Sequence, residues 1–105
     1  MDLIKIGIYS EHKLLLDGLI SLISNFKDIV IELNENSTDK LVKRKDLDRI
    51  HILILNPQTL SKSVMNIIVR LQSVFPKLKI LILSAEEDEG NILKTIKAGA
   101  KGFLG

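Results

Sequence analysis

Short apolar runs alternate with longer polar segments along the whole chain. Five of these runs predict β-strands, because each is a few residues long and ends at polar or turn-forming residues. They lie at 4–9, 29–33, 50–55, 78–83 and 102–104. The run at 50–55 is almost wholly apolar, which is typical of a central parallel strand covered on both faces. The run at 29–33 is less apolar and is expected nearer an edge.

Helices are predicted between the strands, where apolar residues recur every three or four positions. One helix lies over 14–23, a second runs from Val64 until Pro76 ends it, and a third lies before the natural cap Gly99. The acidic residues at 86–89 suit the start of the third helix, where the helix dipole favours negative charge. A short helix is also expected within 34–48, with three inward anchors. These anchors are Leu41, Val42 and Leu47.

The regular alternation of strand and helix predicts an α/β fold, a doubly wound parallel sheet with right-handed crossovers. In such sheets ligands bind at the carboxyl ends of the strands. Ser10 and Glu11 follow the first predicted strand, Asn56 follows the third and Ser84 follows the fourth. These four residues are therefore the candidates for chemistry.

Composition narrows the class of protein. The chain has 105 residues, of which 46% are hydrophobic, and it contains no Cys. One domain over 1–105 is expected, and disulfide scaffolds, thiolate metal sites and cysteine nucleophiles are excluded. Fifteen Lys and Arg against thirteen Asp and Glu are too balanced to predict binding to nucleic acid or a membrane. Without a long apolar run or a signal-peptide pattern, we expect a soluble, cytoplasmic domain.

Three stretches resemble the receiver domain of bacterial two-component response regulators, in particular the LuxR/NarL type. They read FPKLKILILSA (75–85), IKAGAKGFL (96–104) and IKIGIYSEHKLLLDGL (4–19). The resemblance implies a flavodoxin-like (CheY-like) five-stranded sheet in the order 2-1-3-4-5, with the last helix missing from this chain. It also implies a C-terminal helix-turn-helix domain in the full protein. DNA binding would then belong to that absent domain.

Receivers transfer a phosphoryl group to an aspartate after the third strand, with Mg²⁺ held by that aspartate and an acidic pair after the first. By the resemblance, the acceptor position is Asn56, whose amide cannot form an acyl phosphate, and the acidic pair is Ser10 and Glu11. Ser84 matches the family's hydroxyl position, and Phe103 would be the aromatic partner of a hydroxyl–aromatic switch. The family's lysine would follow the last residue of this chain.

Pro57 argues against a hidden aspartate at position 56. Spontaneous conversion of Asn to Asp needs a backbone N–H on the next residue, and proline has none. The acceptor is therefore lost. Asn56 is expected to act as a structural amide that joins loops across the pocket rather than as a ligand-binding group.

Each remaining candidate has a plainer interpretation beside the functional one. Glu11 is either a weak Mg²⁺ ligand or a solvated loop carboxylate, and the second is favoured. Ser84 and Phe103 are either a switch or a loop hydroxyl and a core phenyl, and again the second is favoured. His12 is expected to make a capping or loop contact, whereas His51 has no evident partner.

The basic run at 40–45 is interpreted as a solvated helix face rather than a nucleic-acid patch, because acidic residues follow it. The resemblance implies a homodimer, because the family commonly pairs through the face made by its fourth helix, fifth strand and fifth helix. The candidates there are Ile92, Lys94, Thr95 and Lys97.

The sequence thus predicts an atypical receiver (a pseudo-receiver) that controls a transcriptional regulator through dimerisation or protein interaction, without phosphorylation of an aspartate. It is not expected to be an enzyme, to need a cofactor beyond weakly bound Mg²⁺, or to bind a membrane. A sensor kinase or another protein is the expected partner. Two alternatives stay open: a phosphorelay receiver with an unorthodox acceptor, and a flavodoxin-like module that binds a small ligand.

Overall fold

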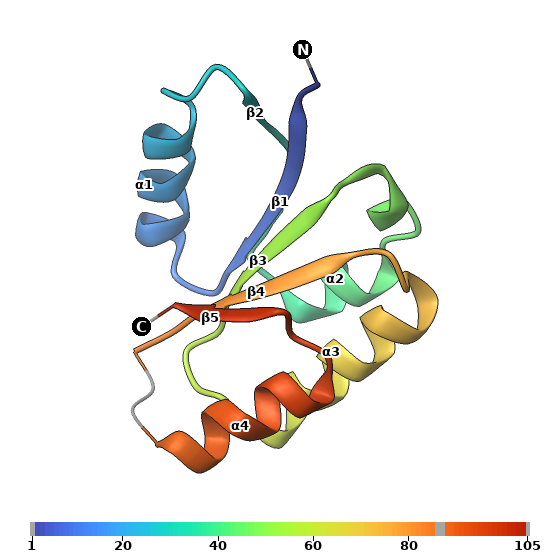
Figure 1. The fold of residues 1–105 in the computed structure, drawn as a ribbon. Helices are drawn as coiled ribbons and strands as arrows, with labels where there is room; N and C mark the ends of the chain where they lie inside the picture. The colour runs from blue at the N-terminus through green and yellow to red at the C-terminus, as the bar shows by residue number, and fades with distance from the viewer. Residues whose placement is uncertain (1, 86–87, 105) are drawn as a thin grey trace.

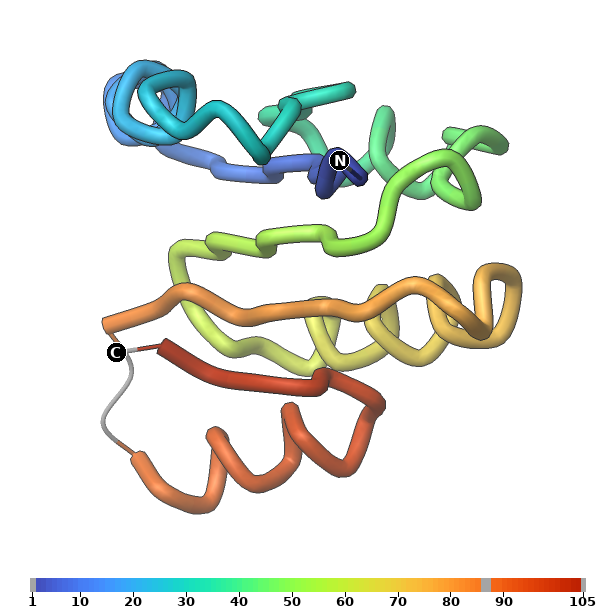
Figure 2. The backbone as a smooth tube through the Cα atoms, turned by 45° about the horizontal axis from the view of Figure 1, so that its top comes forward, coloured from blue at the N-terminus to red at the C-terminus, as the bar shows by residue number. Residues whose placement is uncertain are grey.

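Five parallel strands form one sheet, in the order β2-β1-β3-β4-β5, in the computed structural model, which describes residues 2–85 and 88–104 (Figure 1). The predicted fold class and strand order are confirmed. The strands are β1 (Ile4–Ser10), β2 (Ile29–Glu35), β3 (Ile52–Asn56), β4 (Lys79–Leu83) and β5 (Gly102–Leu104). Figure 2 shows β3 in the middle of the sheet, as its continuous apolar run predicts, and β2 lies at an edge.

Helices cover both faces of the sheet. They are α1 (Lys13–Ile23), α2 (Thr38–Lys43), the 3-10 helix η1 (Leu47–Arg49), α3 (Lys62–Val74) and α4 (Glu89–Ala98). The first helix, α1, lies on one face, and α2, α3 and α4 lie on the other (Figure 1). Among the described residues, no helix combines the length and the hydropathy that crossing a bilayer requires.

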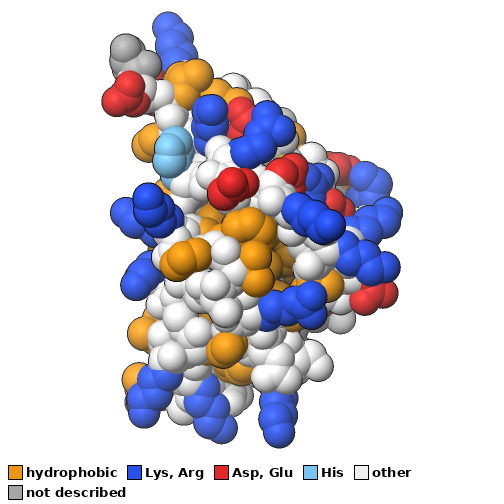
Figure 3. Space-filling view, turned by 90° about the vertical axis from the view of Figure 1, so that its right-hand side faces the viewer, with side chains coloured by type: hydrophobic (Ala, Val, Ile, Leu, Met, Phe, Trp, Pro, Cys, Tyr) orange, Lys and Arg blue, Asp and Glu red, His pale blue; other side chains and the backbone are white. Residues whose placement is uncertain are grey.

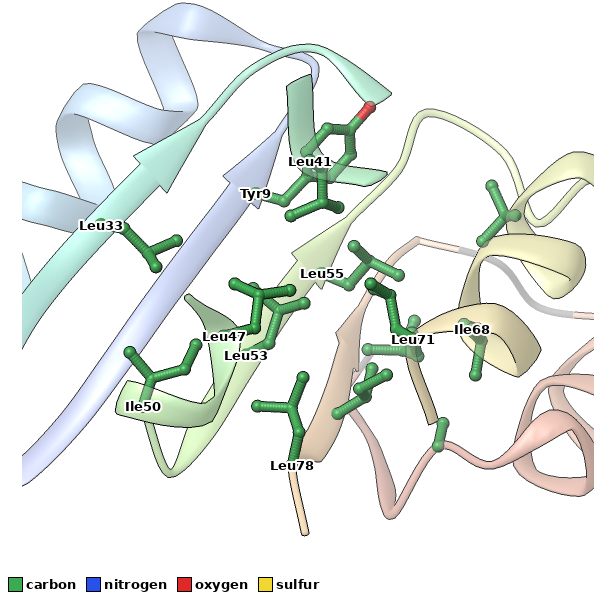
Figure 4. Packing of buried hydrophobic residues seen from close by; sticks show 14 of the residues in the cluster. Tyr9, Leu33, Leu41, Leu47, Ile50, Leu53, Leu55, Ile68, Leu71 and Leu78 are labelled. Carbon is green, nitrogen blue, oxygen red and sulfur yellow. The ribbon is translucent and has the colours of Figure 1, made fainter. Parts of the chain in front are cut away.

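The larger core cluster lies between the sheet and the α2–α3 side (Figure 4). Leu41 and Leu47 have no exposed surface, so two of the three predicted anchors of the 34–48 segment are confirmed. The third, Val42, is only half-buried. On the opposite face a smaller cluster forms around Ile6, Ile8 and Leu16.

The helix ends follow the local sequence. The Ser61 hydroxyl caps α3 by accepting a hydrogen bond from the Val64 N–H at 3.3 Å. The Asp88 carboxylate caps α4 in the same way, and Gly99 ends that helix with a φ of 131°, which favours glycine. Of the predicted acidic helix start, Glu86 and Glu87 lie outside the described residues.

Two expectations about surface residues were wrong. Thr95 is fully buried, and its hydroxyl donates to the Asn91 carbonyl at 2.8 Å, so it cannot lie on a dimer face. His51 does have a partner, because its Nδ1 accepts the Lys5 N–H at 2.9 Å. Helical spacing alone does not decide which side of α4 faces the core, so it could not show that Thr95 is buried. The Lys5–His51 hydrogen bond could not be predicted either, because it joins residues that are far apart in the sequence.

Candidate functional site

The carboxyl ends of β1, β3 and β4 bring the predicted site positions to one edge of the sheet. Ser10 and Asn56 are direct partners in the β1–β3 ladder, and Ser84 follows the end of β4. The parallel order of the strands dictates this arrangement, because neighbouring parallel strands end on the same side.

A chain of neutral hydrogen bonds connects the three strand ends. The Ser10 hydroxyl donates to Asn56 Oδ1 at 2.8 Å, and Asn56 Nδ2 donates to the Leu83 carbonyl at 2.7 Å. Ser10 is fully buried, and its Oγ also accepts the His12 N–H at 3.2 Å. We call this connection, formed by Ser10, Asn56 and the Leu83 carbonyl, the neutral bridge. It contains no ionisable side chain.

Both carboxylate oxygens of Glu11 accept hydrogen bonds from the protein. Oε1 accepts from the Tyr9 hydroxyl at 2.9 Å, and Oε2 accepts from the Gln58 N–H at 2.9 Å. Glu11 therefore joins β1 to the loop after β3. Burial raises the pKa of the Tyr9 phenol well above its ordinary value. The hydrogen bond to Glu11 and the negative charge of the Glu11 carboxylate raise this pKa further.

The described residues do not fit Mg²⁺. This ion needs hard oxygen ligands in octahedral geometry, and proteins bind it through one or two carboxylates whose oxygens are free to coordinate it. Of Ser10, Glu11 and Asn56, only Glu11 carries a carboxylate, and internal donors already occupy both its oxygens. Over residues 2–85 and 88–104, no three His, Cys, Asp or Glu side chains cluster closely enough to hold a metal ion.

The two residues that match the family's switch positions lie on β5 and directly after β4. Ser84 is buried, and its N–H donates to the Leu104 carbonyl at 3.0 Å, which connects the end of β4 to β5. Phe103 is half-buried and packs against the larger core cluster. This geometry favours the interpretation of Phe103 as a core phenyl.

A hollow of about 370 Å³ opens beside the neutral bridge. Its lining has no Asp, Glu, Lys or Arg among the described residues; it consists of His12, Leu15, Asn56, Pro57, Gln58 and Ala85. His12 is the residue before α1, but its side chain makes no capping hydrogen bond, contrary to one expectation for it. The His12 side chain is exposed, and the contact that His12 makes is through its backbone N–H, which donates to the Ser10 hydroxyl oxygen.

The contacts of Tyr9 were not predicted. Residues two apart on a strand project from the same face, so a tyrosine two positions before a glutamate is a signal that could have found the Tyr9–Glu11 pair. The contact between Glu11 and the Gln58 N–H has no such local signal, because the two residues are 47 positions apart.

Comparison with known proteins identifies the fold. No family model matches the chain, and no curated protein matches it in sequence. Among solved structures, one described as a pilus assembly-related protein of Burkholderia pseudomallei has a TM-score of 0.86 at 23% identity, over 97% of this chain and 77% of that one. The signal receiver domain of the response regulator NarL from Mycobacterium tuberculosis has a TM-score of 0.85 at 13% identity, over 99% and 84%.

The isolated receiver domain of RcsB from Salmonella enterica serovar Typhimurium, solved with the phosphomimetic BeF₃⁻, is similar as well. Its TM-score is 0.82 at 15% identity, over 98% of this chain and 77% of that one. At these identities the likeness concerns the fold. The chain has the CheY-like fold of response-regulator receiver domains, as its sequence motifs predicted.

Proposed function

We propose that this domain is a pseudo-receiver, a receiver-type module that acts through protein interaction without phosphorylation of an aspartate. The observation that carries the proposal is the neutral bridge, which occupies the position where receivers hold their acidic pocket. Asn56 uses its amide oxygen and nitrogen to join β1 to β4 at 2.8 and 2.7 Å.

The chemistry of the bridge supports this proposal. Phosphoryl transfer to this position needs a nucleophilic carboxylate. An amide is a poor substitute, because its oxygen carries no full negative charge and the lone pair of its nitrogen is delocalised into the carbonyl. The acidic cluster of a receiver also needs a cation, since carboxylates in close contact repel one another. With Ser10 and Asn56 in these positions, hydrogen bonds hold the strand ends together without a cation.

The proteins that share the fold support a proposal for the setting of the module. NarL is a response regulator, and RcsB has been solved bound to the promoter rprA. These likenesses support the expected place in a transcriptional regulator, with a second copy of the chain or another protein as partner. The pilus assembly proteins of Burkholderia, at 23–24% identity, support a second setting in an assembly protein.

The test is the intact mass of the protein after incubation with Mg²⁺ and acetyl phosphate. The natural chain is expected to gain no phosphoryl group. Asn56→Asp and the double variant Ser10→Asp/Asn56→Asp are the matched comparisons. If either variant gains a phosphoryl group, the substituted positions alone account for the loss of phosphorylation in the natural chain. Labelling of the natural chain would overturn the proposal and support an unorthodox acceptor.

A small-ligand module, the remaining alternative, makes a different prediction. A metabolite or anion that binds in the hollow beside Asn56 would raise the melting temperature without a covalent change. We expect no such rise in a thermal-shift screen of common anions and nucleotides. A rise that Asn56→Ala abolishes would support the ligand-binding function instead.

A further inference from the structure

A second hollow, of about 500 Å³, lies between the C-terminal parts of α2 and α3. Four basic residues line it: Lys43, Arg44, Lys45 and Arg70. We call this hollow the basic groove. Only part of the run at 40–45 is therefore the solvated helix face that the sequence indicated, because its C-terminal half faces α3.

The rest of the basic groove is apolar. Leu71 is buried at its base, Val42 and Phe75 are half-buried, and Val74 is 61% exposed. Val74 and Phe75 also line an adjoining hollow of about 230 Å³, so the apolar strip continues past the end of α3. Figure 3, which views the molecule from the right-hand side of Figure 1, shows hydrophobic side chains gathered on this face with Lys and Arg on both sides.

Three of the four cations are available to a partner. Arg44 is held by Glu35 at 2.7 Å and by Asp46 at 3.0 Å. Within the described part of the chain, Lys43, Lys45 and Arg70 form no ion pair. Among the described residues, these three cations therefore have no carboxylate within ion-pairing distance, although the protein as a whole carries a formal charge of only +2.

Positive charge around an exposed apolar strip is complementary to a segment that carries both carboxylates and hydrophobic side chains. A nucleic acid backbone would satisfy the cations but would leave Val74 and Phe75 without apolar contacts. A neutral hydrophobic segment would cover the strip and bring no charge to Lys43 or Arg70. Apolar anchors at the centre with charged residues at the rim are the usual anatomy of a protein interface.

We propose that the basic groove docks an acidic amphipathic segment of a protein partner. Hydrophobic side chains of the segment pack on Val74 and Phe75, and its carboxylates pair with Lys43, Lys45 and Arg70. This inference goes beyond the proposed function, because it concerns a different surface and does not depend on whether the strand ends accept a phosphoryl group.

The test uses two fluorescein-labelled synthetic peptides with the isotope-labelled chain. One carries Leu and Glu at helical spacing and the other alternates them, so that a helical and an extended ligand are both covered. Binding is measured by fluorescence anisotropy and mapped by amide chemical shifts. At least one peptide is expected to bind, with shifts centred on 42–45 and 70–77, and binding is expected to weaken as salt is raised.

Matched variants locate the contact. Val74→Gln is expected to weaken binding about tenfold, whereas Val69→Gln, on the same helix and 53% exposed, is expected to leave it unchanged. Arg70→Glu is expected to weaken binding by a similar factor, and Lys62→Glu is the matched charge reversal outside the groove. The amide spectrum of each variant verifies that it is folded.

Three results would overturn the inference. The first is that neither peptide binds, and the second is that groove and control variants bind equally well. The third is that a DNA duplex displaces the peptide at lower concentration, with shifts at the same residues, which would assign the groove to nucleic acid. None of these outcomes changes the mass test, so the two proposals can fail separately.

Discussion

Replacing Asn56 by aspartate tests the neutral bridge through its pH dependence. In the natural chain, Asn56 Nδ2 donates to the Leu83 carbonyl at 2.7 Å. An ionised carboxylate at position 56 has no proton to donate, so it faces that carbonyl oxygen as a second acceptor. The protonated carboxyl can still donate. The Ser10 hydroxyl can donate to the other oxygen in both forms, so the lost donor to the Leu83 carbonyl and the partial burial of the group set the direction. The folded state is expected to favour the protonated form, and the pKa of the new carboxyl to lie above its value in the unfolded chain.

The sign of the pH effect follows from this direction. The unfolded carboxyl titrates near pKa ~3.9. Below that pH the group is neutral in both states, and Asn56→Asp costs little. As the pH rises through the unfolded and then the folded pKa, the stability of the variant falls relative to the natural chain. At pH ~7 the full cost of a lost, partly buried hydrogen bond is present, roughly 1–3 kcal/mol.

Urea unfolding of the two proteins at a series of pH values between about 3.5 and 7.5 measures this difference. Asn56→Ala is the control, because it removes both hydrogen bonds of the side chain without adding a titrating group. Its cost relative to the natural chain is expected to be the same at every pH. A constant difference for Asn56→Asp, or a variant as stable as the natural chain at neutral pH, would refute the bridge.

Four further predictions concern Tyr9, its partner Glu11, the core and the end of α4. Tyr9 is the single tyrosine in a chain without tryptophan, so its phenolate absorbance is expected to appear only well above pH ~10, together with alkaline loss of stability. Glu11→Gln is expected to lower the Tyr9 pKa only partly, because burial is the main cause; complete reversal would contradict this. Leu41→Ala is expected to cost about 2–5 kcal/mol in urea unfolding, since Leu41 has no exposed surface. Gly99→Ala is expected to lower the melting temperature, because it combines a φ of 131° with a Cβ only 2.8 Å from Gln72 Cγ.

The sequence predicted the strands well because each strand is a local signal. The run that became β3 is apolar on both faces, although β3 begins two residues after the predicted start at 50 and ends one residue after the predicted end at 55. The strand-end rule then placed Ser10, Asn56 and Ser84 at the same edge without any knowledge of side-chain contacts. These predictions depend on residues that are neighbours in sequence or on the topology of the sheet.

Contacts between distant segments could not be predicted in this way. The Lys5–His51 and Glu11–Gln58 hydrogen bonds join residues that are 46 and 47 positions apart. The basic groove likewise combines residues from two helices, and only the fold brings Lys43 near Arg70. A charge run therefore looks like a solvated face in the sequence, although part of it borders an apolar strip in three dimensions.

The neutral bridge also bears on how such a domain can be regulated. A ligand shifts a conformational equilibrium only by the difference in its affinity for the two states. In an acidic pocket, a cation and a phosphoryl group supply that difference through charge. Ser10 and Asn56 form hydrogen bonds with each other, with the Leu83 carbonyl and with the His12 N–H, which are all neutral groups. The bridge therefore holds no charged group that could pair with an added cation or phosphoryl group. A partner that binds at a separate surface, such as the basic groove, can control the domain through its concentration alone. This mode of regulation does not require the strand ends to change conformation, and it is the mode that the neutral bridge favours.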